Sequence, residues 1–116
     1  MQSIVSMMAA ALPCPLRANA GKYDEECVEY GFNTTLYNGA RYEVRMKLHI
    51  VARTMARGLE LETLLDRLLV RRDETPLTET VTACARNGGG WLVDGGWHIR
   101  IAYYDMVIRD VQGLTR

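Results

Sequence analysis

Histidine side chains are the first place to look for chemistry in this sequence. The two histidines, His49 and His98, both fall on the polar side of segments that we expect to be strands. A catalytic zinc site takes three protein ligands, and no spacing in the sequence places a third ligand beside either histidine. We therefore predict no metal site and no cofactor.

Cysteine gives no clearer active site. The three cysteines, Cys14, Cys27 and Cys84, are odd in number and widely spaced, which is typical neither of a disulfide framework nor of a zinc site. Nucleophilic catalysis needs a cysteine beside a histidine that lowers its pKa, and no local motif predicts such a pair. We expect free, partly buried thiols and no catalytic residue.

Two Gly-Gly-Trp clusters end at Trp91 and Trp97. Glycine lets backbone amides approach an anion closely, but a phosphate-binding loop leads from a strand into the N-terminus of a helix. Strand-like segments follow both clusters instead. We interpret the glycines as turn residues of a hairpin, and the tryptophans as sheet residues or aromatic anchors of a protein contact.

Charge is balanced over the chain but not along it. The 14 Lys and Arg residues equal the 14 Asp and Glu residues, so no net field draws the protein to nucleic acid or to a membrane. Basic residues are concentrated in residues 41–57, and an acidic run, Asp24, Glu25 and Glu26, precedes them. Each is a candidate recognition patch, with an ordinary solvated surface as the alternative.

The elements that must position these residues begin with residues 41–51. Apolar and polar residues alternate strictly from Arg41 to Ile50, which is typical of a half-buried strand. A helical stripe through Val44, Leu48 and Val51 is the alternative. We predict a strand, and with residues 97–104 in the same sheet the basic side chains of both segments would line one face.

Apolar spacing and turn residues define the other elements. We expect a helix over residues 1–12, ended by Pro13 and Pro15, and a connector over 13–22. Asn38-Gly39 and Asp94-Gly95-Gly96 each predict a hairpin turn. The remaining expected elements are a strand over 27–37, a helix over 59–72, a helix from 75 to about 86, a break at 87–90, and strands over 91–93 and 97–104. Residues 105–111 either prolong the last strand or begin a new one.

Together these elements predict one α+β domain spanning residues 1–116, because 48% hydrophobic content is what a single core of this size needs. It has an N-terminal helix, two antiparallel β-hairpins forming a sheet, and two central helices packed on one face of that sheet.

The N-terminal region is consistent with two cellular locations of the protein. Residues 4–12 are apolar, and Ala18-Asn19-Ala20 resembles a signal cleavage site, so export with cleavage after Ala20 would leave Cys27 and Cys84 as a possible bridge. Residues 1–3 carry no Lys or Arg, however, and Arg17 lies between the apolar run and the cleavage-like site. The apolar run is also shorter than the ~20 residues of a membrane span. We predict a cytoplasmic protein with a docked N-terminal helix and no membrane contact.

The function class follows from the ordinary core and the missing chemical motifs. We predict a non-enzymatic binding protein that covers a surface of a partner, either another protein or a nucleoprotein complex. Small inhibitors, immunity proteins and adaptors work this way, and a phage or mobile-element inhibitor of a host nucleic-acid defence complex, such as an anti-CRISPR, is one instance.

Two alternatives belong to other classes. One is a nucleic-acid-binding domain that uses the basic sheet face, and the other is a small enzyme whose site is assembled only in the fold. A homodimer is also consistent with exposed sheet edges. The candidate partner-binding residues are Arg41, Arg45, Lys47, His49, Arg53, Trp91, Trp97, His98, Arg100 and Tyr104.

Overall fold

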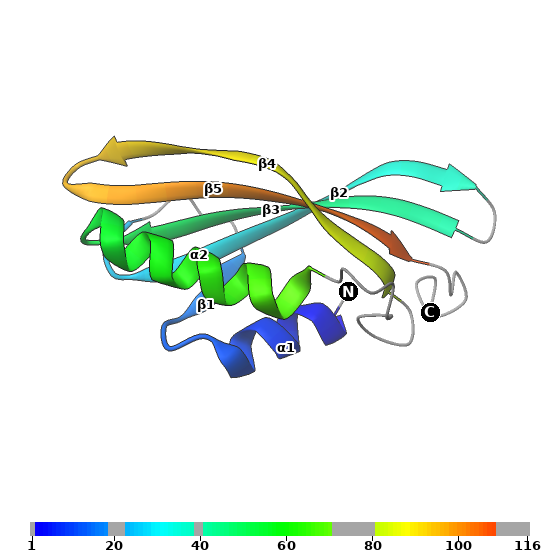
Figure 1. Cartoon of the computed structure of the whole chain (residues 1–116), viewed down its shortest axis with the longest axis horizontal. Helices are drawn as coiled ribbons and strands as arrows, with labels where there is room; N and C mark the ends of the chain where they lie inside the picture. The colour runs from blue at the N-terminus through cyan, green and yellow to red at the C-terminus, as the bar shows by residue number, and fades with distance from the viewer. Residues whose placement is uncertain (1, 19–22, 39–40, 71–80, 109–116) are drawn as a thin grey trace.

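A five-stranded mixed sheet and two helices form the part of the chain that the computed structural model describes, which is residues 2–18, 23–38, 41–70 and 81–108 (Figure 1). The elements in chain order are α1 (Gln2–Ala11), β1 (Leu16–Ala18), β2 (Cys27–Asn38), β3 (Arg41–Ala52), α2 (Met55–Leu69), β4 (Val81–Asp94) and β5 (Trp97–Ile108). The protein is therefore α+β in character.

The sheet has the strand order β1-β2-β3-β5-β4. The pairs β2–β3, β3–β5 and β4–β5 are antiparallel, whereas β1 runs parallel to β2. A connector was predicted over residues 13–22, and this is wrong over Leu16–Ala18, which form β1. Residues 19–22 lie outside the described part. The sheet is mixed because of this short strand.

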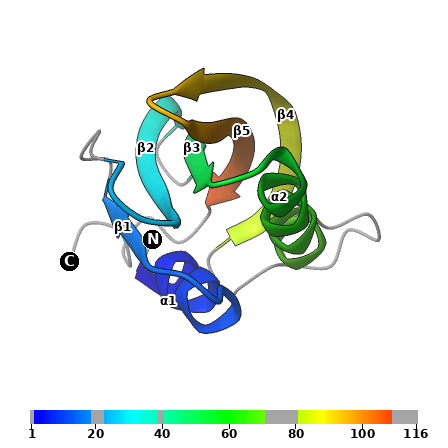
Figure 2. The same cartoon turned by 90° about the vertical axis from the view of Figure 1, so that its left-hand side faces the viewer.

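The core lies between one face of the sheet and both helices. Alternate residues of β3, from Val44 to Ile50, are buried there together with Ile4 of α1 and Leu65 of α2. We call this side the helix face and the opposite side the outer face. Figure 2 shows the sheet curving around this core, with α1 and α2 on its concave side. The alternation that predicted a strand over residues 41–51 is thus confirmed, since β3 covers them.

Helix α2 begins where Thr54 caps it, because the Thr54 side chain accepts a hydrogen bond from the backbone N–H of Arg57 at 3.1 Å. Leu61, Leu65 and Leu69 recur at helical spacing and are buried. The helix expected over 59–72 therefore exists, but it starts at Met55 and ends at Leu69.

The helix expected from residue 75 to about 86 is wrong over its described part, because Val81–Asp94 forms β4. The β-branched Val81 and Thr82 favour a strand. The glycine run after Asn87 does not break this strand but forms an irregularity within it: the register shifts between Arg86 and Gly89, and Gly88 has φ of 83°. Such a bulge accommodates a positive φ without ending the pairing. Residues 75–80 lie outside the described part.

Strands β4 and β5 meet at the second predicted turn, where Gly95 and Gly96 both have positive φ. Residues 105–108 prolong β5, and 109–111 lie outside the described part. Strands β2 and β3 pair as far as Asn38 and Arg41, although Gly39 of the first predicted turn is itself not among the described residues.

Candidate partner-binding surface

The residues that were predicted to form one basic surface lie on two faces of the sheet. Directly opposed residues of antiparallel strands project on the same side, and Tyr104 is opposed to the core residue Met46. By this register, Arg45, Lys47 and His49 project from the outer face, and His98, Arg100 and Tyr104 project from the helix face. The prediction of a single surface is therefore wrong. The side chain of Arg41 is not among those described.

One of the basic residues on the outer face is already paired with a carboxylate. Arg45 Nε donates to Asp105 Oδ1 at 2.9 Å, and this hydrogen bond holds the pKa of Asp105 below its usual value. Lys47 forms no ion pair with any residue in the described ranges. A shallow hollow of about 210 Å³ lies beside these residues and is lined by Gly31, Phe32, Asn33, Arg45, Lys47 and Tyr103.

His49 is half-buried on this face. Its Nδ1 lies 3.3 Å from the hydroxyl oxygen of Tyr23, and it is opposed to the buried Glu29 across β2 and β3. Burial lowers the pKa of His49, and the nearby Lys47 lowers it further. Both effects favour the neutral imidazole.

Of the two roles considered for Trp97, its burial fits that of a sheet residue, because the side chain is 9% exposed. It packs in a small outer-face cluster with Cys27, Val51 and Ile99. The guanidinium carbon of Arg53 lies 4.2 Å from the centre of the Trp97 ring, which is a cation–π contact. Arg53 itself is exposed.

Cys14, Cys27 and Cys84 form no disulfide. Cys27 belongs to the outer-face cluster and Cys84 to the core on the helix face, so the sheet separates them and the bridge considered for an exported protein is not formed. Burial raises the pKa of the Cys14 thiol to about 11 and also raises the pKa of Cys27. Both shifts oppose thiolate formation, which a nucleophilic cysteine requires.

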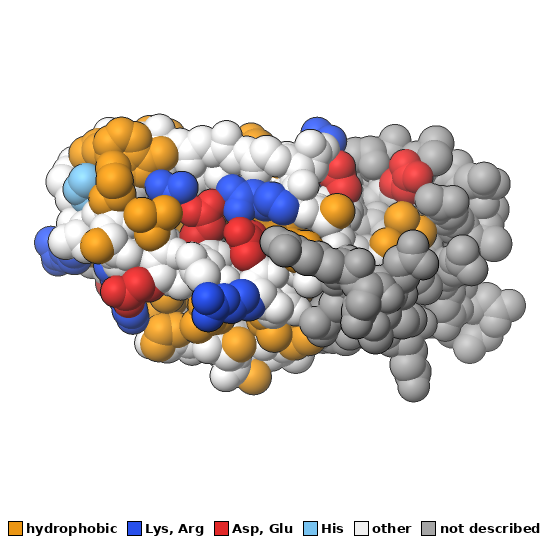
Figure 3. Space-filling view, viewed as in Figure 1, with side chains coloured by type: hydrophobic (Ala, Val, Ile, Leu, Met, Phe, Trp, Pro, Cys, Tyr) orange, Lys and Arg blue, Asp and Glu red, His pale blue; other side chains and the backbone are white. Residues whose placement is uncertain are grey.

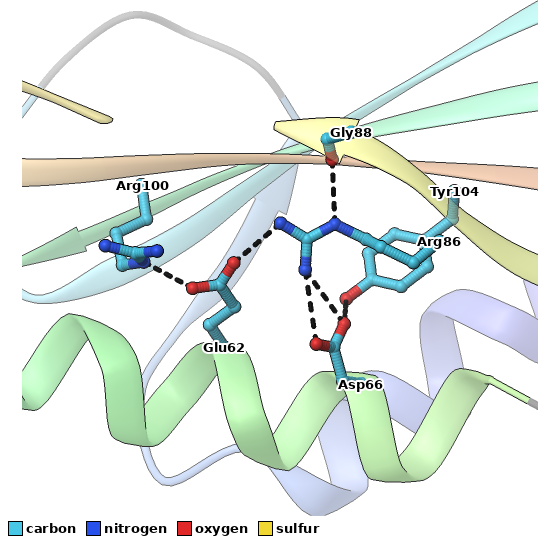
Figure 4. A network of polar contacts seen from close by, with 6 residues as sticks. All are labelled: Glu62, Asp66, Arg86, Gly88, Arg100 and Tyr104. Carbon is cyan, nitrogen blue, oxygen red and sulfur yellow. Dashed lines mark hydrogen bonds and ion pairs between the residues drawn. The ribbon is translucent and has the colours of Figure 1, made fainter. Parts of the chain in front are cut away.

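A network of charged side chains joins α2 to β4 and β5 on the helix face (Figure 4). Glu62 of α2 accepts hydrogen bonds from Arg86 at 2.6 Å and from Arg100. Asp66, one turn further along α2, accepts from Arg86 at 3.0 Å and from the hydroxyl of Tyr104. Burial and the hydrogen bond to Asp66 both raise the pKa of Tyr104.

This network accounts for two of the predicted binding residues. Tyr104 is fully buried and Arg100 is held by Glu62, so both serve the contact between helix and sheet. Gly58 contributes by its size: a Cβ there would lie 3.3 Å from Cδ of Arg100, so a larger residue would crowd this approach of α2 to β5.

Sequence reasoning missed Glu62, Asp66 and Arg86. A signal was present, because Glu62 and Asp66 are four residues apart and each directly follows a leucine of the buried face of α2. Acidic residues that border an apolar helical stripe at this spacing face a neighbouring element, and they need cationic partners there.

The acidic run is also partly occupied. Asp24 accepts a hydrogen bond from Arg17 at 3.1 Å, and Glu26 accepts one from Arg57 at 2.7 Å. Glu25 is exposed. The Arg57 contact ties this segment to α2, so only part of the run is open to a partner.

Large apolar side chains are exposed at the end of the β4–β5 hairpin. Trp91 is 45% exposed, Leu92 42% and Val93 53%, and we call these three residues the β4 tip. The Trp91 ring stacks on His98 with centroids 5.9 Å apart. Figure 3 shows hydrophobic side chains gathered at this end of the molecule, beside a histidine. Trp91 and Val93 project from the same face of the sheet and Leu92 from the other. Isolated exposed apolar residues are normal, but neighbouring ones such as Trp91 and Val93 are typical of an interaction surface.

The described residues contain neither a metal site nor a membrane-spanning helix. Within residues 2–18, 23–38, 41–70 and 81–108, no group of three or more His, Cys, Asp or Glu residues is arranged to hold a metal ion. Neither α1 nor α2 has the length and apolar composition needed to span a membrane.

Comparison with known proteins gives a likeness to solved structures. No protein-family model and no curated protein matches this chain. Fourteen chains of solved structures match, and one belongs to a structure described as the virion of a native gene transfer agent particle. The two chains are 13% identical and have a TM-score of 0.60, and the match covers 87% of this chain and 84% of that one. This likeness shows a shared fold.

Proposed function

We propose that this protein is a non-enzymatic binding protein that acts as a component of a phage-type particle, where it covers a surface of another protein. The fold it shares with a virion chain carries this proposal, because the match extends over most of both chains rather than over a common substructure. Fold alone does not fix function, so the surface of this chain has to supply the second argument.

The β4 tip supplies it. A protein contact needs apolar anchors that lose water on binding, and tryptophan is among the residues that contribute most to such contacts. Trp91 is exposed at the edge of the sheet, whereas Arg86 and Arg100 both form ion pairs with Glu62 within the molecule. The inhibitor of a nucleic-acid defence complex is a narrower form of the same binding function and stays a prediction, as does the cytoplasm as its compartment.

A nucleic-acid-binding function is less well supported. Phosphate binding needs several free cations on one surface. The candidate cations divide between two faces, and Arg45 on the outer face is already paired with Asp105. A small enzyme is less well supported too, because the charged groups of the Glu62 network satisfy one another and the two thiols with shifted pKa values are shifted away from reactivity.

Co-sedimentation tests the proposal. The tagged chain is produced in its native host under conditions that release particles, and nuclease-resistant particles are separated from free protein on a density gradient. We expect the chain in the fractions that hold protected DNA, and we expect Trp91→Asp to move it to the free-protein fractions.

The matched control is Thr63→Asp, which adds the same charge at an exposed position of α2 away from the β4 tip. It should leave the distribution unchanged. A wild-type chain that stays with free protein while protected DNA sediments normally would overturn the proposal. Binding to naked DNA that weakens steeply with salt and with Lys47→Glu would favour the nucleic-acid alternative.

A further inference from the structure

The edge of the sheet at β4 is open and unprotected. Strand β4 has β5 as its one neighbour in the described sheet, so the other edge of residues 89–94 has no strand paired with it there. Edge strands usually carry charged residues or proline that prevent pairing with another chain. Residues 88–93 of β4 contain neither, and three of these six residues form the exposed β4 tip.

The position of this edge leaves it accessible. In Figure 1 the hairpin end of β4 lies on the far side of β5 from α2. A further strand could therefore add beside residues 88–94 without displacing the helix. Backbone groups specify an extended segment as the occupant, because only an extended segment presents donors and acceptors at the spacing of a strand.

The sequence of this edge is complementary to itself about Trp91. Three glycines precede Trp91 and the sequence Leu-Val-Asp follows it, so a second copy that runs antiparallel places each larger residue opposite a glycine. The pairs are Trp91 with Trp91, Leu92 with Gly90, Val93 with Gly89, and Asp94 with Gly88. A Cβ built on Gly90 has no atom within 4 Å, so the space beside it is open to a neighbour.

The faces of the sheet agree with this register. Gly89 and Val93 are opposed to Ala102 and His98 of β5, so both project from the helix face. Gly90 and Leu92 are opposed to Ile101 and Ile99, so both project from the outer face. The Val93–Gly89 and Leu92–Gly90 pairs thus each join residues of the same face, which antiparallel pairing requires. Large side chains that cover a cross-strand glycine stabilise such edges.

Charge agrees as well. Asp94 of one copy comes opposite Gly88 of the other, and the carbonyl of Gly88 accepts a hydrogen bond from Arg86 at 2.7 Å. The antiparallel register therefore keeps the two Asp94 carboxylates apart. A parallel alignment in register would instead place the two Asp94 carboxylates together.

We propose that two copies of this chain join through their β4 edges, antiparallel and centred on Trp91, to form one continuous ten-stranded sheet. A twofold axis perpendicular to the sheet relates the copies, and the contact is the same patch on both. The proposal deepens the binding function given above, since it names the partner of the β4 tip as a second copy.

Cysteine cross-linking tests the register. Opposed residues in antiparallel strands have Cα atoms about 4.5 to 5.5 Å apart, within the range that a disulfide spans. Trp91→Cys should therefore give a disulfide-linked dimer on mild oxidation. Val93→Cys is the matched control, because it lies on the same face of the same strand and is at least as exposed, yet the two Val93 positions are separated by four residues along the pair.

Sedimentation of the wild-type chain tests the association itself. We expect a monomer–dimer equilibrium, and we expect Trp91→Lys to weaken it at least tenfold because two like charges become directly opposed. Leu59→Lys adds the same charge to an equally exposed leucine of α2 and should leave the equilibrium unchanged.

A wild-type chain that is monomeric at every concentration would overturn the proposal, and so would a Val93→Cys variant that cross-links as fast as Trp91→Cys. Either result would leave the particle association untouched. Loss of particle association with an intact dimer would instead overturn the proposed function and keep this inference.

Discussion

Strand β4 contains two regions that differ in the polarity and exposure of their side chains. Near its middle, Arg86 reaches inward and shares Glu62 and Asp66 with β5, so charge is used inside the molecule. At its end, the apolar β4 tip is left exposed. The difference teaches that the charge of Arg86 secures α2 to the sheet, whereas the exposed end of the same strand is apolar.

Removal of the central carboxylate breaks the first region most severely. Glu62→Ala leaves Arg86 and Arg100 without their common acceptor in a poorly solvated site, so we expect a loss of about 3 to 5 kcal/mol in the free energy of unfolding. Urea denaturation measures it. Glu60→Ala removes a more exposed carboxylate paired with Arg57 and should cost less than about 1 kcal/mol. Equal losses for the two variants would show that the Glu62 network is not structural.

Replacement of each tryptophan by alanine tests whether the β4 tip belongs to the core. Trp97→Ala empties a buried site beside Ile99 and should cost about 3 to 5 kcal/mol. Trp91→Ala loses its stacking on His98 and should cost about 1 kcal/mol. Thermal and urea unfolding measure both. A Trp91 variant as unstable as the Trp97 variant would mean that the β4 tip is part of the core rather than a contact surface.

Removal of the Tyr104 hydroxyl tests whether the Glu62 network and the β4 edge are independent. Tyr104→Phe keeps the buried ring and removes the donor to Asp66, which still has Arg86 as a partner. We expect a loss of about 1 kcal/mol in unfolding free energy, with the self-association of the chain unchanged. Reduced association in this variant would couple the network to the β4 edge and contradict their independence.

Much of the fold is predictable because it depends on local patterns. Alternation predicted β3, leucine spacing predicted α2, and glycine-containing turns predicted where strands reverse. Strand β1 was missed because three residues, Leu16 to Ala18, give no periodicity, and their parallel pairing with β2 is a long-range contact. Strand β4 was predicted only over residues 91–93, because Thr75-Pro76 has the form of a helix start and the glycines around Gly88 have the form of a break.

The candidate surface was less predictable because it depends on register. Whether Arg100 shares a face with Arg45 is decided by how β5 pairs with β3, and a shift of one residue would exchange the two faces. Burial of Trp97 and exposure of Trp91 follow from the same pairing, since the residues are six apart but lie on opposite sides of a hairpin and of the sheet. The sequence predicted the same role for both tryptophans, but the structure buries Trp97 and exposes Trp91.

The smallest expected effect concerns pH. In the folded protein the pKa of His49 lies below its usual value of 6.5, chiefly because of burial, so the unfolded chain takes up a proton first as the pH falls. Stability from neutral His49 is therefore fully present above pH 6.5 and is lost as the pH falls through 6.5 toward the folded pKa. Urea denaturation between pH 7.5 and 5 should show this slope, and His49→Gln should flatten it. Because Glu29 opposes the effect and Lys47 adds to it, Lys47→Gln should reduce the slope without abolishing it. An unchanged slope in His49→Gln would assign the proton uptake to another group.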